Sequence, residues 1–289
     1  MNVIPNPGVL GASIEGLDLS QPLDTPTVDK LINLLGRHGV LAYPDQHLTP
    51  RQLRDFSRNF GELEINVAQS SDSELPEVMT LSNIVENGKP IGLADAGQDW
   101  HTDMSYSNMI AFTNILYGLK IPHRDGKPLG NTEFCSMHAA YDALPDPIKT
   151  QLDGKTITHD FNKFWENMRQ RPGSTRPPLT GAQRRAKPPA VHPAVMIHPI
   201  TQRKVLYANP GYSIRINQLP EDESDKLLAF LFEHQLRPEF RYAHPWQVNT
   251  LLMWDNMGTI HNAVADYRAD EPRLIKRCQV KASRFFKMP

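Results

Sequence analysis

Short apolar runs rich in β-branched residues recur along the chain and are typical of strands. We predict six strands from these runs: 40–43, 78–81, 110–119, 205–208, 250–254 and 274–281. Helical periodicity is less common and is clearest in 27–37, where apolar residues at 28, 31, 32, 34 and 35 fall on one stripe. Similar patterns predict three more helices, at 51–60, 137–144 and 222–234, and Pro145 and Pro238 follow the last two.

The order of these elements bears on the fold class. Strands joined by irregular connections, without a regular alternation of strand and helix, favour an antiparallel sandwich or jelly roll over a doubly wound sheet. We therefore expect a mainly β fold with peripheral helices.

The stretch 171–193 differs from the rest of the chain and reads RPGSTRPPLTGAQRRAKPPAVHP. Its prolines and basic side chains fit either a linker between two domains or a long functional loop over a site. The strands on both sides are needed to complete one sheet, so we favour the loop and treat 1–289 as a single domain. Because the stretch has little apolar area to offset the entropy of being fixed, we expect a mobile lid.

Composition narrows the class of partner. Of the 289 residues, 39% are hydrophobic, enough to bury a sizeable core, and 22% are charged, enough to keep the surface soluble. The formal net charge of -1 argues against a nucleic-acid partner. No apolar run approaches the roughly 20 residues that cross a bilayer. The first residues lack a basic segment followed by an apolar one, so we expect a cytoplasmic protein with Cys135 and Cys278 reduced.

The candidate chemistry centres on His101 and Asp103, in the phrase DWHTDMSY. Side chains two apart on an extended strand point to the same face, so both can reach one ion. His261 is the best third ligand, and two histidines with one carboxylate suit non-haem iron(II) and oxygen chemistry. A second triplet, His123-Arg124-Asp125, follows a proline and precedes Gly-Lys-Pro, so it is typical of a solvated turn.

Two arginines follow the third candidate ligand. Arg273 and Arg277 are four apart on a predicted strand, so they face the same way. If that face is interior, two guanidinium groups point into a cavity near the metal and require anions. The alternative is a solvated face shared with Lys276 and Lys281, and the pattern alone leaves both open.

Several short motifs occur along the chain in an order typical of one family. They are WHTD at 100–103, GNTEF at 130–134, AAYDAL at 139–144, THDF at 158–161, RIN at 215–217, WDN at 254–256 and ADY at 265–267. In these motifs the chain resembles the taurine dioxygenase family, which includes the 2,4-dichlorophenoxyacetate dioxygenases, and the likeness runs nearly end to end.

The resemblance implies a double-stranded β-helix, the jelly-roll core of iron(II)/2-oxoglutarate dioxygenases, with the metal on the His-Asp-His triad. It places the distal carboxylate of 2-oxoglutarate on Arg273 and Thr132, and an acidic group of the primary substrate on Arg277. It also implies that 2-oxoglutarate and O2 become succinate and CO2 while a small anionic organic substrate is hydroxylated. Related halogenases have a small residue at the carboxylate position, so Asp103 indicates hydroxylation. We also expect a homo-oligomer.

The substrate positions depart from taurine dioxygenase. Its polar contacts to taurine fall at Asn66 and Gly97 here, while aromatic neighbours fall at Trp165 and Tyr212. Aromatic walls without the polar contacts suggest an anion larger and more apolar than taurine, with Asn66, Trp165 and Tyr212 lining its pocket. The alternative is that the two aromatic residues are ordinary packing residues.

Two other functions fit the same triad. A metal-binding jelly-roll sensor without catalysis would need neither Arg273 nor Thr132. A zinc hydrolase would need a general base beside the metal, for which Asp99 is the obvious nearby carboxylate. Asp255 fits better as a residue that braces a loop or a ligand.

Overall fold

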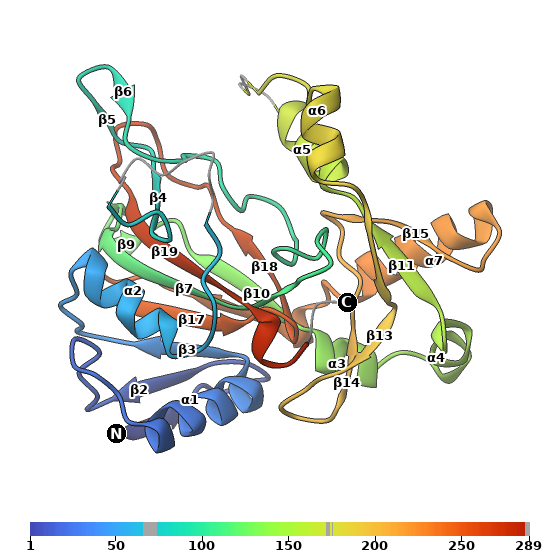
Figure 1. The fold of residues 1–289 in the computed structure, drawn as a ribbon, viewed down its shortest axis with the longest axis horizontal. Coiled ribbons are helices and arrows are strands. Elements are labelled where there is room, and N and C mark those ends of the chain that lie inside the picture. The colour runs from blue at the N-terminus through green and yellow to red at the C-terminus, as the bar shows by residue number, and fades with distance from the viewer. Residues whose placement is uncertain (66–73, 172–173, 175, 287–289) are drawn as a thin grey trace.

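The structure is a computed structural model that describes residues 1–65, 74–171, 174 and 176–286. Its largest element is a seven-stranded sheet whose neighbouring strands are antiparallel except for β2 and β3 (Figure 1). In order across this sheet the strands are β1 (Asn2–Pro5), β2 (Ala12–Glu15), β3 (Val40–Tyr43), β17 (Leu251–Asp255), β7 (Ala111–Lys120), β19 (Leu274–Lys281) and β4 (Met79–Ser82).

A smaller antiparallel sheet packs against the large one. Its strands are β16 (Arg241–His244), β10 (Thr132–Ser136) and β18 (Thr259–Ala263). Phe134 of the small sheet lies in one apolar cluster with Trp254 and Ile275 of the large sheet, and the Phe134 and Trp254 rings are 5.4 Å apart. One part of the core is therefore formed between the two sheets, with the metal-binding candidate His261 on the smaller.

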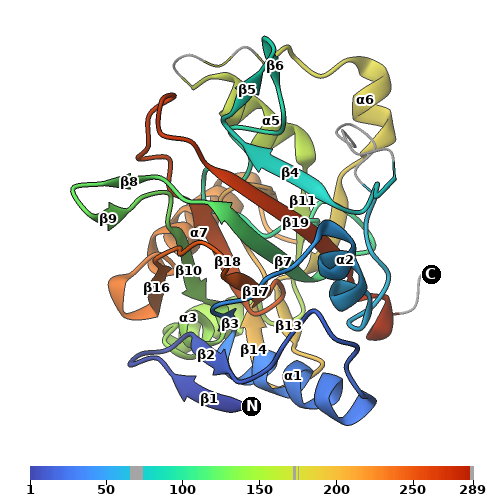
Figure 2. The ribbon, with the colours of Figure 1, turned by 90° about the vertical axis from the view of Figure 1, so that its left-hand side faces the viewer.

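Two helices cover the other face of the large sheet (Figure 2), α1 (Thr25–His38) and α2 (Pro50–Arg58). Asp24 caps the first, its carboxylate accepting the Thr27 N–H at 2.9 Å, and Gly39 ends it with a φ of 70°. The buried residues of α1 are Val28, Leu31, Ile32, Leu35 and Gly36. The predicted apolar stripe is thus the face that the helix buries.

A third antiparallel sheet has its own apolar cluster with α7 (Glu221–His234). Its strands are β12 (Ala190–Pro193), β11 (Thr156–His159) and β15 (Ser213–Ile216). The other elements are the hairpins β5 (Val85–Glu86)/β6 (Lys89–Pro90), β8 (His123–Arg124)/β9 (Lys127–Pro128) and β13 (Val195–Ile197)/β14 (Lys204–Leu206), the helices α3 (Met137–Asp142), α4 (Asp146–Leu152), α5 (Phe161–Arg169) and α6 (Gly181–Ala186), and the 3-10 helices η1 (Pro238–Phe240) and η2 (Ala282–Arg284).

All six predicted strands and all four predicted helices are present, with ends that differ by a few residues. The stretch 171–193 differs from the prediction, because it contains α6 and ends in β12, which pairs with β11. Residues 172, 173 and 175 of this stretch lie outside the described residues. Within the ranges given above, no helix is both long and apolar enough to span a membrane.

Candidate metal centre

The loop carrying His101 is joined to β18 by a pair of backbone hydrogen bonds. The His101 N–H donates to the carbonyl of His261 at 3.0 Å, and the His261 N–H donates to the carbonyl of His101 at 2.9 Å. The sequence had suggested that Asp103 lies on an extended strand. In the structure it lies instead in a turn, in which Met104 has a φ of 57°. The two ligand candidates of the loop converge because the chain turns there.

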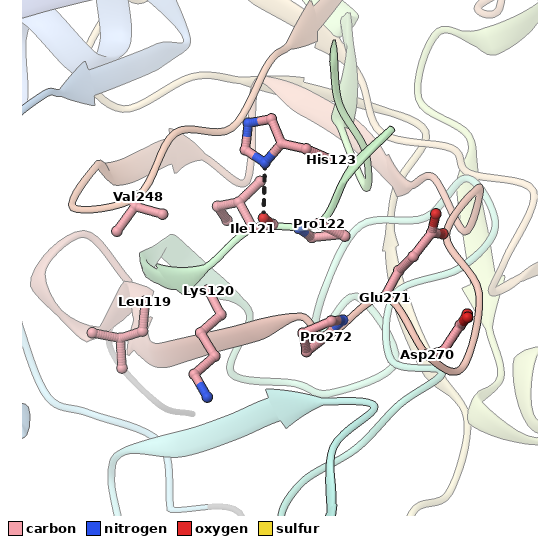
Figure 3. A pocket seen from close by; sticks show the side chains of 9 residues that line it. All are labelled: Leu119, Lys120, Ile121, Pro122, His123, Val248, Asp270, Glu271 and Pro272. Atoms are coloured by element: carbon pink, nitrogen blue, oxygen red, sulfur yellow. Dashed lines mark hydrogen bonds between the residues drawn. The ribbon is translucent and has the colours of Figure 1, made fainter. Parts of the chain in front are cut away.

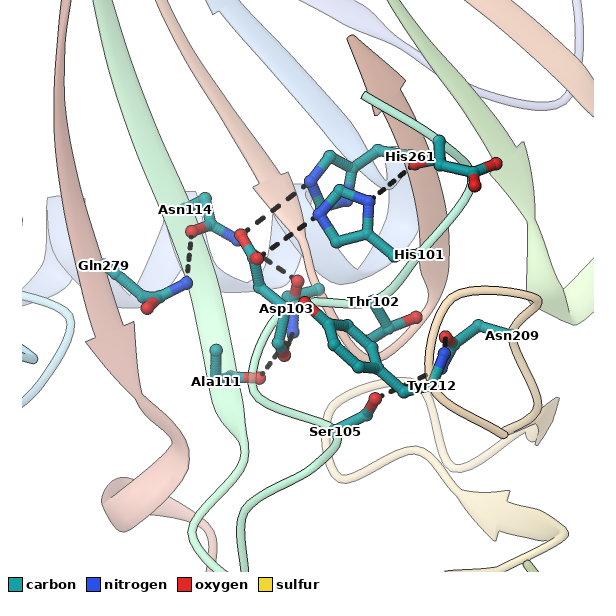
Figure 4. A network of polar contacts seen from close by, with 12 residues as sticks. His101, Thr102, Asp103, Ser105, Ala111, Asn114, Asn209, Tyr212, His261 and Gln279 are labelled. Atoms are coloured by element: carbon teal, nitrogen blue, oxygen red, sulfur yellow. Dashed lines mark hydrogen bonds and ion pairs between the residues drawn. The ribbon is translucent and has the colours of Figure 1, made fainter. Parts of the chain in front are cut away.

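The three candidate side chains are buried and face a common point (Figure 4). His101 Nε2 lies 3.4 Å from Asp103 Oδ1, and His261 Nε2 lies 3.8 Å from Asp103 Oδ2. Ligand atoms bonded to one metal at about 2.1 Å and at right angles are about 3.0 Å apart, so a small contraction would form the site. Two imidazoles and one carboxylate can hold a divalent ion and leave its other coordination positions open for ligands.

The tautomer of His101 and the charges of the other two candidate ligands also suit metal binding. His101 Nδ1 lies 2.7 Å from the Asp99 carbonyl, which fixes the proton on Nδ1 and leaves the Nε2 lone pair for a metal. Burial lowers the pKa of His261 well below its usual value, so this imidazole is neutral. Burial alone would raise the pKa of Asp103. The attraction of Arg277, whose Nη1 lies 3.4 Å from Oδ2, and of His101 outweighs burial, so the pKa of Asp103 is below its usual range. The carboxylate is therefore ionised.

A chain of buried amides supports the backbone of Asp103. Asn256 Nδ2 donates to the Asp103 carbonyl at 2.8 Å and to the Ala111 carbonyl at 3.2 Å. Asn114 Nδ2 donates to Asn256 Oδ1 at 3.1 Å, and Gln279 Nε2 donates to Asn114 Oδ1 at 2.8 Å (Figure 4). The turn that presents the carboxylate is thus tied to β7 and β19 of the large sheet. Sequence reasoning missed these residues, although an asparagine inside the apolar strand at 110–119 was a signal.

Arg273 is buried, with 7% of its surface exposed, and lacks an anionic partner. Its Nη2 donates to the Gly130 carbonyl at 3.3 Å and its guanidinium carbon lies 5.6 Å from the centre of the Tyr267 ring, while its Nε has no hydrogen-bond partner. In the described part of the chain no carboxylate lies within 4.0 Å of this guanidinium. The solvated-face alternative is wrong for Arg273, and a bound anion would satisfy it.

Thr132 is buried on β10, two residues after Gly130. Its Oγ1 accepts the indole N–H of Trp246 at 3.0 Å, which leaves the hydroxyl proton of Thr132 available for a ligand oxygen. The two residues expected to hold 2-oxoglutarate therefore both have unused donors.

The expected substrate residues have different environments. The Tyr212 ring is buried 6.0 Å from the His101 ring, so it lines the metal site. The Trp165 indole instead donates to the Pro177 carbonyl at 2.7 Å, in the stretch 171–193. Asn66 lies outside the described residues. Gly97 is beside the triad, since a Cβ there would be 3.7 Å from His101 Cε1.

Sequence reasoning also missed most of an aromatic wall beside the triad. The Phe164 ring lies 5.1 Å from His101 and 5.0 Å from Tyr212, and the Tyr106 ring lies 4.8 Å from Tyr212 and 4.9 Å from Phe161. These rings come from the turn after Asp103 and from α5. They make the approach to the metal aromatic.

Asp99 is poorly placed as a general base. Its Oδ1 accepts the backbone N–H of Trp100 at 3.0 Å, and its Oδ2 lies 3.6 Å from Arg171 Nη2. Both carboxylate oxygens are engaged outside the triad, which disfavours the zinc hydrolase alternative.

A second group of buried side chains has the composition of a metal site: His138, His198 and Asp255. However, His198 Nδ1 accepts the backbone N–H groups of Ile200 at 3.3 Å and Thr201 at 3.2 Å. Its proton is therefore on Nε2, which lies 2.9 Å from Asp255 Oδ2, and no lone pair remains there for a metal. This His–Asp pair lies at the end of β17, and the bracing role suggested for Asp255 stays a prediction.

A surface pocket lies apart from the triad (Figure 3). It is lined by Leu119, Lys120, Ile121, Pro122, His123, Val248, Asp270, Glu271 and Pro272. Glu271 already pairs with Arg124, whose Nε donates to it at 2.9 Å, and His123 Nδ1 lies 3.0 Å from the Ile121 carbonyl. No triad residue lines this pocket. His123 and Arg124 form β8 of a hairpin, and of the triplet predicted as a solvated turn only Asp125 lies in the turn itself.

Comparisons with known proteins agree over nearly the whole chain. The family model for the taurine catabolism dioxygenase TauD, TfdA family matches residues 3–279. The alpha-ketoglutarate-dependent 2,4-dichlorophenoxyacetate dioxygenase of Cupriavidus pinatubonensis is 34% identical in an alignment of 275 positions that covers 90% of this chain and 92% of that protein. Pentalenolactone F synthase of Streptomyces avermitilis is 30% identical in an alignment of 291 positions, gaps included, that covers 96% of this chain and 93% of that one. The solved structure of AAD-2 in complex with Mn(II) and N-oxalylglycine has a TM-score of 0.82 at 28% identity, covering 97% of this chain and 98% of that one.

Proposed function

The chain belongs to the TauD, TfdA family of dioxygenases, and from that premise we propose that it uses iron(II) to hydroxylate a small anionic organic compound. It is a 2-oxoglutarate-dependent dioxygenase, and so an oxidoreductase. Iron(II) as the metal, the binding roles of the individual residues and the class of substrate are our proposals.

The observation that carries the proposal is a two-histidine, one-carboxylate triad with Arg277 beside it, together with Arg273, which is buried without an anion in the described part of the chain. His101, Asp103 and His261 would hold the metal and leave three positions open for 2-oxoglutarate and O2, as suits iron(II). The Mn(II) in the AAD-2 structure supports a divalent ion at such a site.

Arg273 and Thr132 would hold the distal carboxylate of 2-oxoglutarate. The unused Nε of Arg273 and the free hydroxyl proton of Thr132 are the donors this anion needs. N-oxalylglycine, bound in AAD-2, differs from 2-oxoglutarate by an NH in place of one methylene, which supports the same class of cosubstrate. When bound, the metal and 2-oxoglutarate supply an oxidant from O2, with one oxygen atom passing to the substrate and the other to succinate as CO2 leaves.

The rest of the site would orient the substrate and keep water out. Arg277 would bind the substrate's acidic group while its field keeps Asp103 ionised for the metal. Tyr212, Phe164 and Tyr106 would form apolar walls that exclude water from the reacting atoms. An aromatic pocket beside an arginine suits an organic acid with an apolar body, such as an aryloxyalkanoate.

We further propose that the two packed sheets form the double-stranded β-helix of a single domain, and that the lid expected at 171–193 is formed by 176–189, the continuous described segment of that stretch before β12. Arg176 supports the lid, because it makes a two-point ion pair with Asp95 at 2.7 and 2.8 Å and lies 4.8 Å over the Trp165 ring. Limited proteolysis with and without Mn(II), N-oxalylglycine and phenoxyacetate tests this lid. Protection by the ligands is expected, and release of two folded halves would contradict the single domain. The homo-oligomeric state and the cytoplasmic location stay predictions.

The test of function is succinate formation from 2-oxoglutarate with iron(II), O2 and a panel of small acids. Aryloxyacetates, alkyl sulfonates and short carboxylates are compared, with His101→Ala as the inactive control. At least one acid should yield succinate and hydroxylated product in equal amounts. A protein that binds metal and 2-oxoglutarate but forms no succinate with any acid would instead be the non-catalytic sensor.

A further inference from the structure

A lysine from the stretch 171–193 reaches the aromatic wall of the site. Lys187 is the C-cap residue of α6. Its Nζ is 4.2 Å from the centre of the Phe161 ring and 5.2 Å from that of Tyr106. Tyr106 in turn is 4.8 Å from Tyr212, the ring next to the metal ligand His101. The ammonium group therefore lies at the outer end of the row of rings that starts at the triad.

This ammonium group has rings as neighbours but no close anion. In the described ranges no carboxylate lies within 4.0 Å of Lys187, although Glu64 is near enough to affect its pKa. Lys187 as a whole is exposed, and partial desolvation of its ammonium group beside the rings lowers its pKa. A cation–π contact of this kind contributes only about 0.5–1 kcal/mol at an exposed site. The group thus keeps donors that an acidic ligand could take.

Arg277 and Lys187 lie toward opposite ends of the aromatic wall. Arg277 is at the inner end, 3.4 Å from the metal-binding candidate Asp103, and Lys187 is at the outer end. An acid with one carboxylate can use only one of them. A ligand with two acidic groups and an apolar body between them uses both, and its body lies along the rings.

We propose, resting on the function proposed above, that Lys187 is a specificity-determining residue that binds a second acidic group at the outer end of the substrate. The preferred substrates are then diacids whose acidic groups are separated by an apolar, ring-sized body. The same contact brings the stretch 176–189 onto the bound substrate.

The test compares phenoxyacetate with 4-carboxyphenoxyacetate, which differ by one carboxylate at the far end of the ring. Wild type, Lys187→Met and Lys187→Arg are measured by succinate formation, and by calorimetric binding of each acid to protein loaded with Mn(II) and N-oxalylglycine. Methionine keeps the apolar stem and removes the charge, whereas arginine keeps the charge. Lys204→Met is the matched control, because Lys204 lies 5.6 Å over the Tyr141 ring, away from the triad.

Wild type should prefer the diacid by about tenfold or more, as expected for one charge-assisted hydrogen bond. Lys187→Met should abolish this preference while phenoxyacetate changes less than about twofold, and Lys187→Arg and Lys204→Met should retain it. Equal losses for both acids in Lys187→Met would mean that the lysine only anchors the lid, and would overturn the inference. The inference would also be overturned if the wild-type protein bound both acids equally or bound neither of them. A diacid preference in calorimetry without succinate formation would keep the inference and reject the proposed catalysis.

Discussion

Gly130 sets the position of the buried arginine, so replacing it should weaken 2-oxoglutarate binding without touching any ligand directly. Its φ is +73°, and a Cβ built on it would lie 2.8 Å from Arg273 Nε and 3.1 Å from Arg273 Cδ. Those separations are too short for carbon against a buried side chain, so Gly130→Ala must displace the guanidinium. The displaced group is the one proposed to meet the distal carboxylate.

The expected loss follows from the contact that is broken. A hydrogen bond to a charged group contributes about 1.5–3 kcal/mol, so the dissociation constant of 2-oxoglutarate should rise about 10- to 150-fold. The alanine also costs about 1–2 kcal/mol of folding stability, because its φ is in the left-handed region. Iron(II) or Mn(II) binding should change little, since the triad is unaltered.

Gly126 offers a matched control for the strain. Its φ is +74°, yet nothing lies within 4 Å of a Cβ built there. Gly126→Ala should therefore lose similar stability and no cosubstrate affinity. Calorimetric titration of N-oxalylglycine into Mn(II)-loaded protein, with a thermal unfolding curve for each variant, separates the two effects. If both variants bound N-oxalylglycine alike, the assignment of Arg273 to the cosubstrate would be refuted.

Three further predictions concern the triad and its surroundings. His101→Ala should abolish Mn(II) binding in a calorimetric titration and His123→Ala should not; retained binding in the first would reject the triad. Asn256→Ala should weaken Mn(II) binding about tenfold, because the Asp103 carbonyl loses its amide donor; unchanged affinity would mean that the amide chain serves stability alone. Arg277→Met should weaken an acidic substrate about tenfold or more in steady-state kinetics and spare N-oxalylglycine; equal losses for both ligands would contradict separate roles for the two arginines.

The sequence predicted five of the seven strands of the large sheet, because their apolar runs are buried in this fold, and it missed β1 and β2 at one edge, where β1 is largely exposed. It did not predict β10 or β18, whose five-residue segments include polar residues that face the site, such as Thr132 and His261. The structure brings the predicted ligand Asp103 together with His101 and His261, but the extended strand expected for it was wrong, because a turn with a positive φ at Met104 gives no periodic signal.

The parts of the site that could not be predicted are those that depend on contacts between distant segments. Arg273 could be proposed as an anion partner from its spacing, but its burial follows from packing beside Gly130 and Tyr267. The contact of Lys187 with Tyr106 joins residues 81 positions apart in sequence, and a proline-rich stretch has no hydrophobic period that would indicate it.

The metal-binding residues and the residues proposed to bind the substrate belong to different parts of the fold. His261 and the amide chain behind Asp103 belong to the two packed sheets, where a change of one side chain disturbs a shared core. Phe164 and Tyr212 belong to a separate, smaller apolar cluster on α5 and the segment before β15, and Lys187 follows α6. Substitutions in this second group can reshape the pocket without disturbing the core that the two sheets share, although Phe164 and Tyr212 themselves lie against the His101 ring. The reaction can therefore stay constant while the substrate changes, and differences in substrate among relatives are expected to map to this aromatic cluster and to the stretch 176–189.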